Sequence, residues 1–165
     1  MFDPTNWTGF HTWLSLIALL SGFIVLFSMM GGKDRPFWVG LFLLTAVATS
    51  ATGFGFPFTG VLPSHIVGVV ALVVLAVTLP ARYHFHKIGH WRWIYVVGVV
   101  ISLYLLSFVG VAQAFLKVPT LHELAPTQAE PPFAIAQGAV LLVFVLFGFS
   151  ALRGSRRPPL RAAYR

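Results

Sequence analysis

Five long apolar stretches constrain the fold of this chain more than any other feature of its sequence. Each approaches the roughly 20 residues that a helix needs to cross about 30 Å of hydrocarbon. Their apolar residues run continuously instead of alternating, which argues against the strands of a membrane barrel. Since only helices and closed barrels satisfy every backbone polar group in lipid, we predict five helical spans. The predicted spans cover residues 12–30, 37–54, 66–81, 93–116 and 133–152.

The composition supports a single membrane domain without a soluble part. Only 9% of the 165 residues are charged, whereas soluble domains usually carry about 25%. The connections between the predicted spans are too short for a further domain. We therefore expect one all-α polytopic bundle over residues 1–152, followed by a basic tail at 153–165. No cationic segment or cleavage site precedes the first span, so we expect it to stay in the protein.

The distribution of lysine and arginine predicts the orientation of the bundle. Ten of the eleven cations lie in the segments 31–36, 82–92 and 153–165. Five spans would place these three segments on one side of the membrane, and cationic loops face the cytoplasm. The sequence therefore predicts an N-terminus outside and a C-terminus inside.

Polar side chains near the predicted outer boundary indicate a pocket. Gln113 and Gln137 lie at matching depths, about 6 to 8 Å below the outer ends of their spans. Polar groups in lipid usually face the bundle interior, and the polar loop 117–132 would cover them as a lid. The candidate ligand-binding residues are His65, Gln113, Gln137, His122, Glu123 and Glu130. The alternative is that both glutamines only join helices, at about 1 kcal/mol each.

Histidines near both boundaries keep a redox function open as an alternative. Two histidines on neighbouring helices can bind a b-type haem, and a quinone site would also use a histidine and a glutamine near the boundary. The candidate metal or haem ligands are His11, His65, His84, His86 and His90. A zinc site is less well supported, since Gly89 interrupts the spacing of His86 and His90 and the chain has no cysteine.

Other classes of function receive less support from the sequence. No catalytic triad or pair of carboxylates is evident, so we assign no catalytic residues and expect an accessory or ligand-binding subunit. A small transporter component remains a further alternative, although five spans do not form equal halves and their interiors carry no charged residue. Nucleic-acid binding is not expected.

Aromatic and small residues predict contacts with lipid and with other helices. The inner loop carries tyrosine, tryptophan and arginine, which favour anionic headgroups at the cytoplasmic face. Small residues recur every four positions in three of the spans, which predicts close helix packing within the bundle, in a homo-oligomer or in a larger membrane complex. The first span, rich in leucine, isoleucine and phenylalanine, is expected to be the most lipid-exposed.

Several short sequence motifs carry a resemblance to a known group of proteins. They are TGFGFPF, LPSH, ARY, WRWIY and FLKVPTLHELAPTQAEPPF, spread over residues 52–138. In these motifs the chain resembles a family of small, uncharacterised bacterial inner-membrane proteins. The resemblance implies a multi-pass protein of the bacterial cytoplasmic membrane and brings no activity with it.

Overall fold

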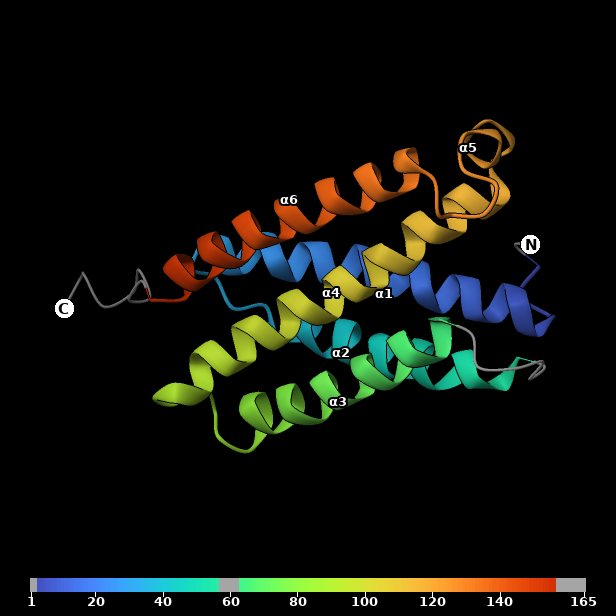
Figure 1. Cartoon of the computed structure of the whole chain (residues 1–165). Coiled ribbons are helices and arrows are strands. Elements are labelled where there is room, and N and C mark those ends of the chain that lie inside the picture. Colours follow the sequence, from blue (N-terminus) through green and yellow to red (C-terminus); the bar gives the residue numbers. More distant parts are fainter. Residues whose placement is uncertain (1–2, 57–62, 157–165) are drawn as a thin grey trace.

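The computed structural model describes residues 3–56 and 63–156, which form helices and connecting turns without a strand (Figure 1). Five helices are long and apolar enough to cross a membrane, which confirms the predicted all-helical fold with five spans. They are α1 (Trp7–Met30), α2 (Pro36–Thr52), α3 (Pro63–Tyr83), α4 (His90–Lys117) and α6 (Pro131–Ser155). A 3-10 turn η1 (Gly53–Gly55) extends α2, and a short helix α5 (Pro119–Leu124) follows α4.

Helix-starting residues make some helices longer than the apolar runs that predict them. The side chain of Asn6 accepts a hydrogen bond from the backbone N–H of Gly9 at 2.7 Å, so α1 begins at Trp7 and not at residue 12. Proline stands at the start of α2, α5 and α6, where its fixed φ suits the first turn and its missing N–H costs nothing.

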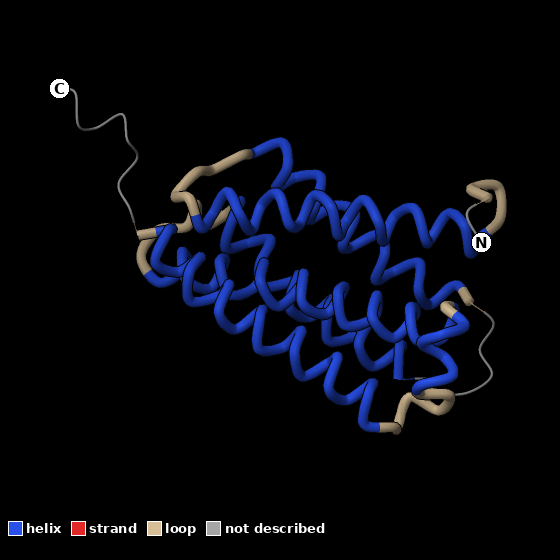
Figure 2. The backbone as a smooth tube through the Cα atoms, turned by 90° about the horizontal axis from the view of Figure 1, so that it is seen from above, coloured by secondary structure: helices blue, strands red, loops and turns tan. Residues whose placement is uncertain are grey.

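Four of the spans form a closed ring. Helix α1 packs against α2, α2 against α3, α3 against α4, and α4 again against α1. Helix α6 lies outside this ring on α4 and α1, as Figure 1 and the perpendicular view in Figure 2 show. A space enclosed by α1 to α4 is therefore bounded by helices on every side.

The connections of the bundle separate cleanly between its two ends. One end carries the N-terminus, η1, the start of α3 and α5, and the other carries the α1–α2 and α3–α4 connections and the end of α6 (Figure 1). We call these the α5 end and the Asp34 end. Most of the predicted basic tail, residues 157–165, lies outside the described residues.

Large apolar side chains fill the ring toward the Asp34 end. The largest fully buried ones include Leu26, Phe42, Leu43 and Leu103. The helices approach closely there, because a Cβ atom at Gly98 would collide with the Thr78 hydroxyl of α3. This half of the bundle is a solid core.

The prediction that the first span is the most lipid-exposed was wrong. In the most apolar window of each helix, 17% of the residues of α6 are buried, compared with 33% for α1. Ala18, Ser21 and Gly22 bring α1 against its neighbours, and a Cβ atom at Gly22 would meet Leu103 and Phe42. Small residues within the leucine-rich sequence therefore hold α1 in the ring, and α6 is the peripheral helix.

A cluster of charges ties the connections together at the Asp34 end. Arg82 and Lys87 both contact Oδ2 of Asp34 at 2.6 Å, which joins the α1–α2 connection to the end of α3 and to the following turn. Burial would raise the pKa of the Asp34 carboxyl, but the hydrogen bonds from the two cations hold it below its ordinary value. The carboxyl therefore stays ionised between its two partners.

Candidate functional site

A cavity of about 590 Å³ lies inside the ring of α1, α2, α3 and α4, toward the α5 end. Its volume falls within the range of pockets that hold small molecules in proteins. Along α1 its wall extends from Thr8 to Leu19, which is about 16 Å along the helix axis. The cavity therefore reaches from the α5 end toward the middle of the bundle.

The cavity exists because the ring helices change from large to small side chains along their length. In α2 the core residues Phe42 and Leu43 give way to Ala46, Thr49 and Ser50 in the cavity wall. The other helices contribute further small residues to the wall, namely Gly68 and Ala71 from α3 and Gly110 and Ala114 from α4. These side chains are too short to fill the centre of a ring whose spacing is set by the core.

His11 of α1 lines the cavity near its outer end, by which we mean the end of the cavity closest to the α5 end of the bundle. The His11 side chain forms a hydrogen bond with Thr52. Its Nδ1 lies 2.9 Å from the hydroxyl oxygen of Thr52, and that hydroxyl donates to the carbonyl of Ala48 at 2.7 Å. Since a hydroxyl has one hydrogen, Nδ1–H of His11 is the donor to Thr52. Nε2 of the neutral imidazole is then a hydrogen-bond acceptor.

Aromatic rings from η1 and from the residue after it stand beside the two histidines of the cavity wall. The ring of Phe56 meets His11 edge to face with centroids 5.2 Å apart, and Phe54 lies 5.8 Å from the ring of His65. All four side chains line the cavity. Two histidine–phenylalanine pairs therefore line this part of the cavity.

Gln113 and Lys117 complete this outer end from the last turns of α4. Both line the cavity and both are exposed. The structure thus brings His65 and Gln113, two of the residues proposed from sequence, to one cavity with His11.

Two hydroxyl groups in the cavity wall have no hydrogen-bond partner among the described residues. Thr49 is 7% exposed and Ser102 is 2% exposed. Other hydroxyls of these helices, including Thr45, Thr78 and Ser107, donate to the carbonyl four residues earlier. A buried hydroxyl without a partner costs about 1 to 3 kcal/mol, so an occupant of the cavity that bonds to Thr49 and Ser102 would stabilise the protein.

Gln137 lies outside the cavity wall, between α6 and α4. Its side-chain Nε2 donates to the carbonyl of Phe108 at 3.0 Å, and its Oε1 is buried without a partner among the described residues. Gln128 similarly donates from Nε2 to the carbonyl of Ala112 at 2.7 Å. These two glutamines attach α6 and the α5–α6 connection to α4.

The predicted lid residues lie on the surface beside α4. His122 and Glu123 are exposed on α5, and only Lys117 and Val118 of the segment 117–132 line the cavity. The carboxylate of Glu130 instead accepts hydrogen bonds from Thr127 and from the backbone of Ala129.

The Glu130 hydrogen bonds also determine its charge state. Desolvation acts to raise the pKa of Glu130, but the hydrogen bonds of Thr127 and Ala129 lower it below its ordinary value. The carboxylate closes the turn between α5 and α6 and stays ionised near neutral pH.

The three histidines of the Asp34 end do not gather into a metal site. His86 has a positive φ of 50° in the turn after α3, and its Nδ1 lies 2.9 Å from the carbonyl oxygen of His84. His90 is the first residue of α4, so the predicted spacing of His86 and His90 does not fall on one helix. Within the described ranges 3–56 and 63–156, no three His, Asp or Glu side chains lie close enough to hold a metal ion.

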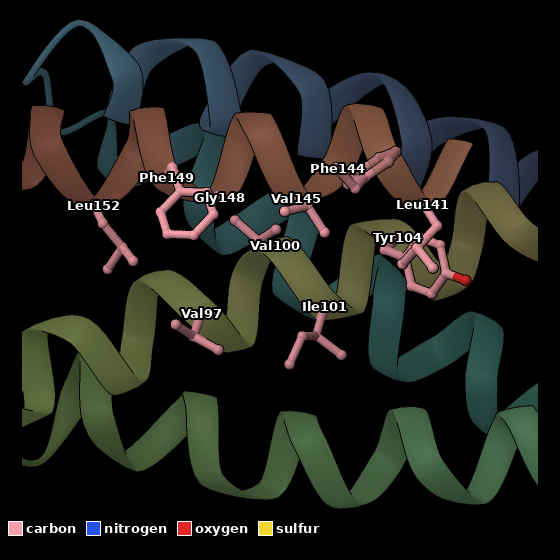
Figure 3. Close-up of a pocket in the computed structure, with 10 residues that line it drawn as sticks. All are labelled: Val97, Val100, Ile101, Tyr104, Leu141, Phe144, Val145, Gly148, Phe149 and Leu152. Atoms are coloured by element: carbon pink, nitrogen blue, oxygen red, sulfur yellow. The ribbon is translucent and has the colours of Figure 1, made fainter. Parts of the chain in front are cut away.

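A second pocket of about 260 Å³ lies between α4 and α6 (Figure 3). Of its lining residues only Tyr104 carries a side-chain polar group, and the others include Phe144, Phe149 and Leu152. Apart from the Tyr104 hydroxyl, this pocket offers only an apolar surface that suits hydrocarbon.

Thr49, Ser102 and Lys117 were missing from the residues proposed from sequence. Thr49 and Ser102 belong to the small-residue stripes that predict close helix packing. In the structure Gly98 packs against α3 as expected, but Ser102, one turn further, lines the cavity. The useful signal was that small residues cluster together in the halves of α2, α3 and α4 that lie toward the α5 end.

The fold and the cavity define a multi-pass helical protein with five helices able to cross a membrane. Comparison with protein-family models, curated proteins and solved structures finds no match to the chain.

Proposed function

We propose that this protein is an accessory or ligand-binding membrane subunit. It holds an amphipathic small molecule in the cavity enclosed by α1, α2, α3 and α4. The observation that carries the proposal is the change of polarity along the cavity wall. His11, His65 and Gln113 lie near its outer end, and Leu19, Leu75 and Leu105 are among the residues lining it further in. A molecule with a polar head and an apolar body matches both parts.

The proposal is tested by measuring which amphipathic small molecules stay bound to the protein during purification. Gly110→Leu fills the cavity, since the nearest atom to an added Cβ is a Leu19 methyl at 3.9 Å. Gly138→Leu is the matched control, because nothing lies within 4 Å of a Cβ at Gly138. Native mass spectrometry of the detergent-purified proteins should show a bound small molecule in wild type and Gly138→Leu, and its loss in Gly110→Leu. Identical spectra for all three proteins would refute the proposal.

A b-type haem is the second candidate ligand, favoured by the presence of His11 and His65 in the wall of one cavity. A metal-bound histidine usually donates its other ring N–H to an oxygen, and Nδ1–H of His11 donates to Thr52. The reduced-minus-oxidised visible spectrum tests this candidate. A haem signal should disappear in His11→Ala and His65→Ala and persist in His122→Ala. A flat spectrum from cells well supplied with haem excludes haem.

The setting of the protein is a further part of the proposal. The sequence resemblance supports the bacterial cytoplasmic membrane, and the distribution of lysine and arginine supports an orientation with the α5 end outside. Among the described residues, every Lys and Arg except Lys117 lies at or near the Asp34 end, which fits a cytoplasmic face in contact with anionic lipids. Exposed apolar residues of α6, including Leu142 and Leu146, are available to lipid, to a second copy or to a larger membrane complex.

A further inference from the structure

The polar groups of the cavity narrow the chemical class of its ligand. We propose that the cavity binds a quinol, meaning an aromatic ring with hydroxyl groups at two opposite positions and an apolar tail. This inference rests on the proposed function, since it names the ligand class for the same cavity.

The outer hydroxyl of the ring is recognised by His11. Because Nδ1–H of His11 donates to Thr52, its remaining hydrogen-bonding atom is Nε2, which accepts. A quinol O–H donates to such an acceptor. A quinone carbonyl has no hydrogen to donate, so the same imidazole favours the reduced form of the ring.

The inner oxygen of the ring is recognised by Thr49. Thr49 lines the cavity, and its buried hydroxyl has no partner among the described residues. Thr49 lies about one helical turn, roughly 5 Å, deeper than Thr52, the partner of His11. A ring that bonds to His11 through one oxygen can therefore extend into the cavity toward Thr49 with the other.

The remainder of the wall suits the flat ring and its tail. Phe54 and Phe56 stand at the outer part of the cavity beside the histidines, where aromatic faces can pack on the ring. Below Thr49 the wall includes Leu19, Leu105 and Leu106. This apolar part accepts a hydrocarbon tail and reaches Ser102, about 16 Å below Gln113 along α4.

Thermal unfolding of the full-length protein in detergent tests the inference. The probes are a benzoquinol with a ten-carbon tail, kept reduced under nitrogen, and the corresponding benzoquinone. A ligand that binds only folded protein raises the melting temperature. For wild type we expect tighter binding of the quinol than of the quinone, by about fivefold for one hydrogen bond.

Variants of Thr49, with Thr45 as the control, test the position of the ring. Thr49→Val keeps the shape of the side chain and should weaken quinol binding by about fivefold, whereas Thr49→Ser should restore it. Thr45→Val should leave quinol binding unchanged, because the Thr45 hydroxyl donates to Leu41 and Thr45 is not among the residues that line the cavity. The melting temperature without ligand shows whether each variant folds, and the rescue by serine separates loss of the hydroxyl from a change of fold.

Two results would overturn the quinol inference: equal quinol binding by wild type and Thr49→Val, or quinone binding as tight as quinol binding. Failure of the broader proposal looks different. If neither probe stabilises wild type but another amphiphile is still lost in Gly110→Leu, the quinol inference fails and the cavity remains a ligand site. If Gly110→Leu retains the same molecules as wild type, both proposals fail.

Discussion

At the scale of single residues, rotation about the helix axis was not readable from the sequence. Counting residues from the predicted boundary placed Gln113 and Gln137 at one level. The structure turns Gln113 to the cavity and Gln137 to the α4–α6 contact. Helices in lipid are apolar on their outward and inward faces alike, so hydropathy gives little information about rotation.

Substitution of Gln137 tests its placement between α4 and α6. Gln137→Met has similar length and removes both the hydrogen bond to Phe108 and the buried Oε1 that has no partner among the described residues. These two effects oppose each other, so the free energy of unfolding should change by about 1 kcal/mol or less. Retention of the cavity ligand should equal that of wild type by native mass spectrometry. Loss of the ligand with the fold intact would place Gln137 at the binding site.

Asp34 should give the stability a dependence on pH. Its pKa is lowered in the folded protein from an unfolded value of about 3.9. Its ionised form therefore stabilises the fold at pH values above about 4, and this contribution is lost as the pH falls through the lowered pKa. Asp34→Asn should cost about 1 kcal/mol or less at pH 7, since the Asp34 side chain is 47% exposed.

The measurement for Asp34 is the difference in unfolding free energy between wild type and Asp34→Asn at several pH values. This difference should shrink as the pH falls below about 4. Thr120→Ala, at an exposed position of α5 without a titratable group, is the control and should show no such trend. A difference that stays constant to the lowest pH would contradict the ion-pair explanation.

At the scale of helices, the number and approximate extent of the spans followed from the sequence, because the thickness of the hydrocarbon core sets the length of apolar sequence that a spanning helix needs. The role of each small residue did not follow. Gly98 permits close packing against Thr78, Gly110 lines the cavity, and a Cβ at Gly138 would meet nothing within 4 Å. The effect of a small residue depends on what faces it, and that is a property of the assembled helices.

Alanine substitutions separate these roles. Gly98→Ala should destabilise the protein by about 1 to 3 kcal/mol, because the added methyl group meets a Thr78 side chain that is 1% exposed and bonded to Val74. Gly138→Ala should be neutral or slightly stabilising, since alanine favours the helix more than glycine. Thermal unfolding in detergent measures both. Equal stability of the two variants would disprove the close α3–α4 approach.

At the scale of the whole molecule, the sequence predicted which segments share an end, because five spans force the connections to alternate. The cavity was not readable at this scale, since it depends on four helices whose mutual contacts no local pattern specifies. The orientation of the ends across a membrane remains a prediction from the distribution of lysine and arginine.

Cysteine labelling tests the orientation, and the absence of native cysteine removes any background. Thr127→Cys lies at the α5 end and Ile88→Cys at the Asp34 end, both at exposed positions. A membrane-impermeant maleimide should label Thr127→Cys on intact cells and Ile88→Cys only after permeabilisation. The reverse pattern would place the cavity end in the cytoplasm.

The division of the ring into a solid half and a half containing about 590 Å³ of cavity makes the molecule mechanically asymmetric. Hydrostatic pressure favours states that eliminate internal void, in proportion to its volume. Pressure should therefore unfold the α5 end before the Asp34 end. A ligand that occupies the cavity should make the α5 end less compressible. Ligand binding would then change the stiffness of the α5 end, and this change would affect any partner bound there.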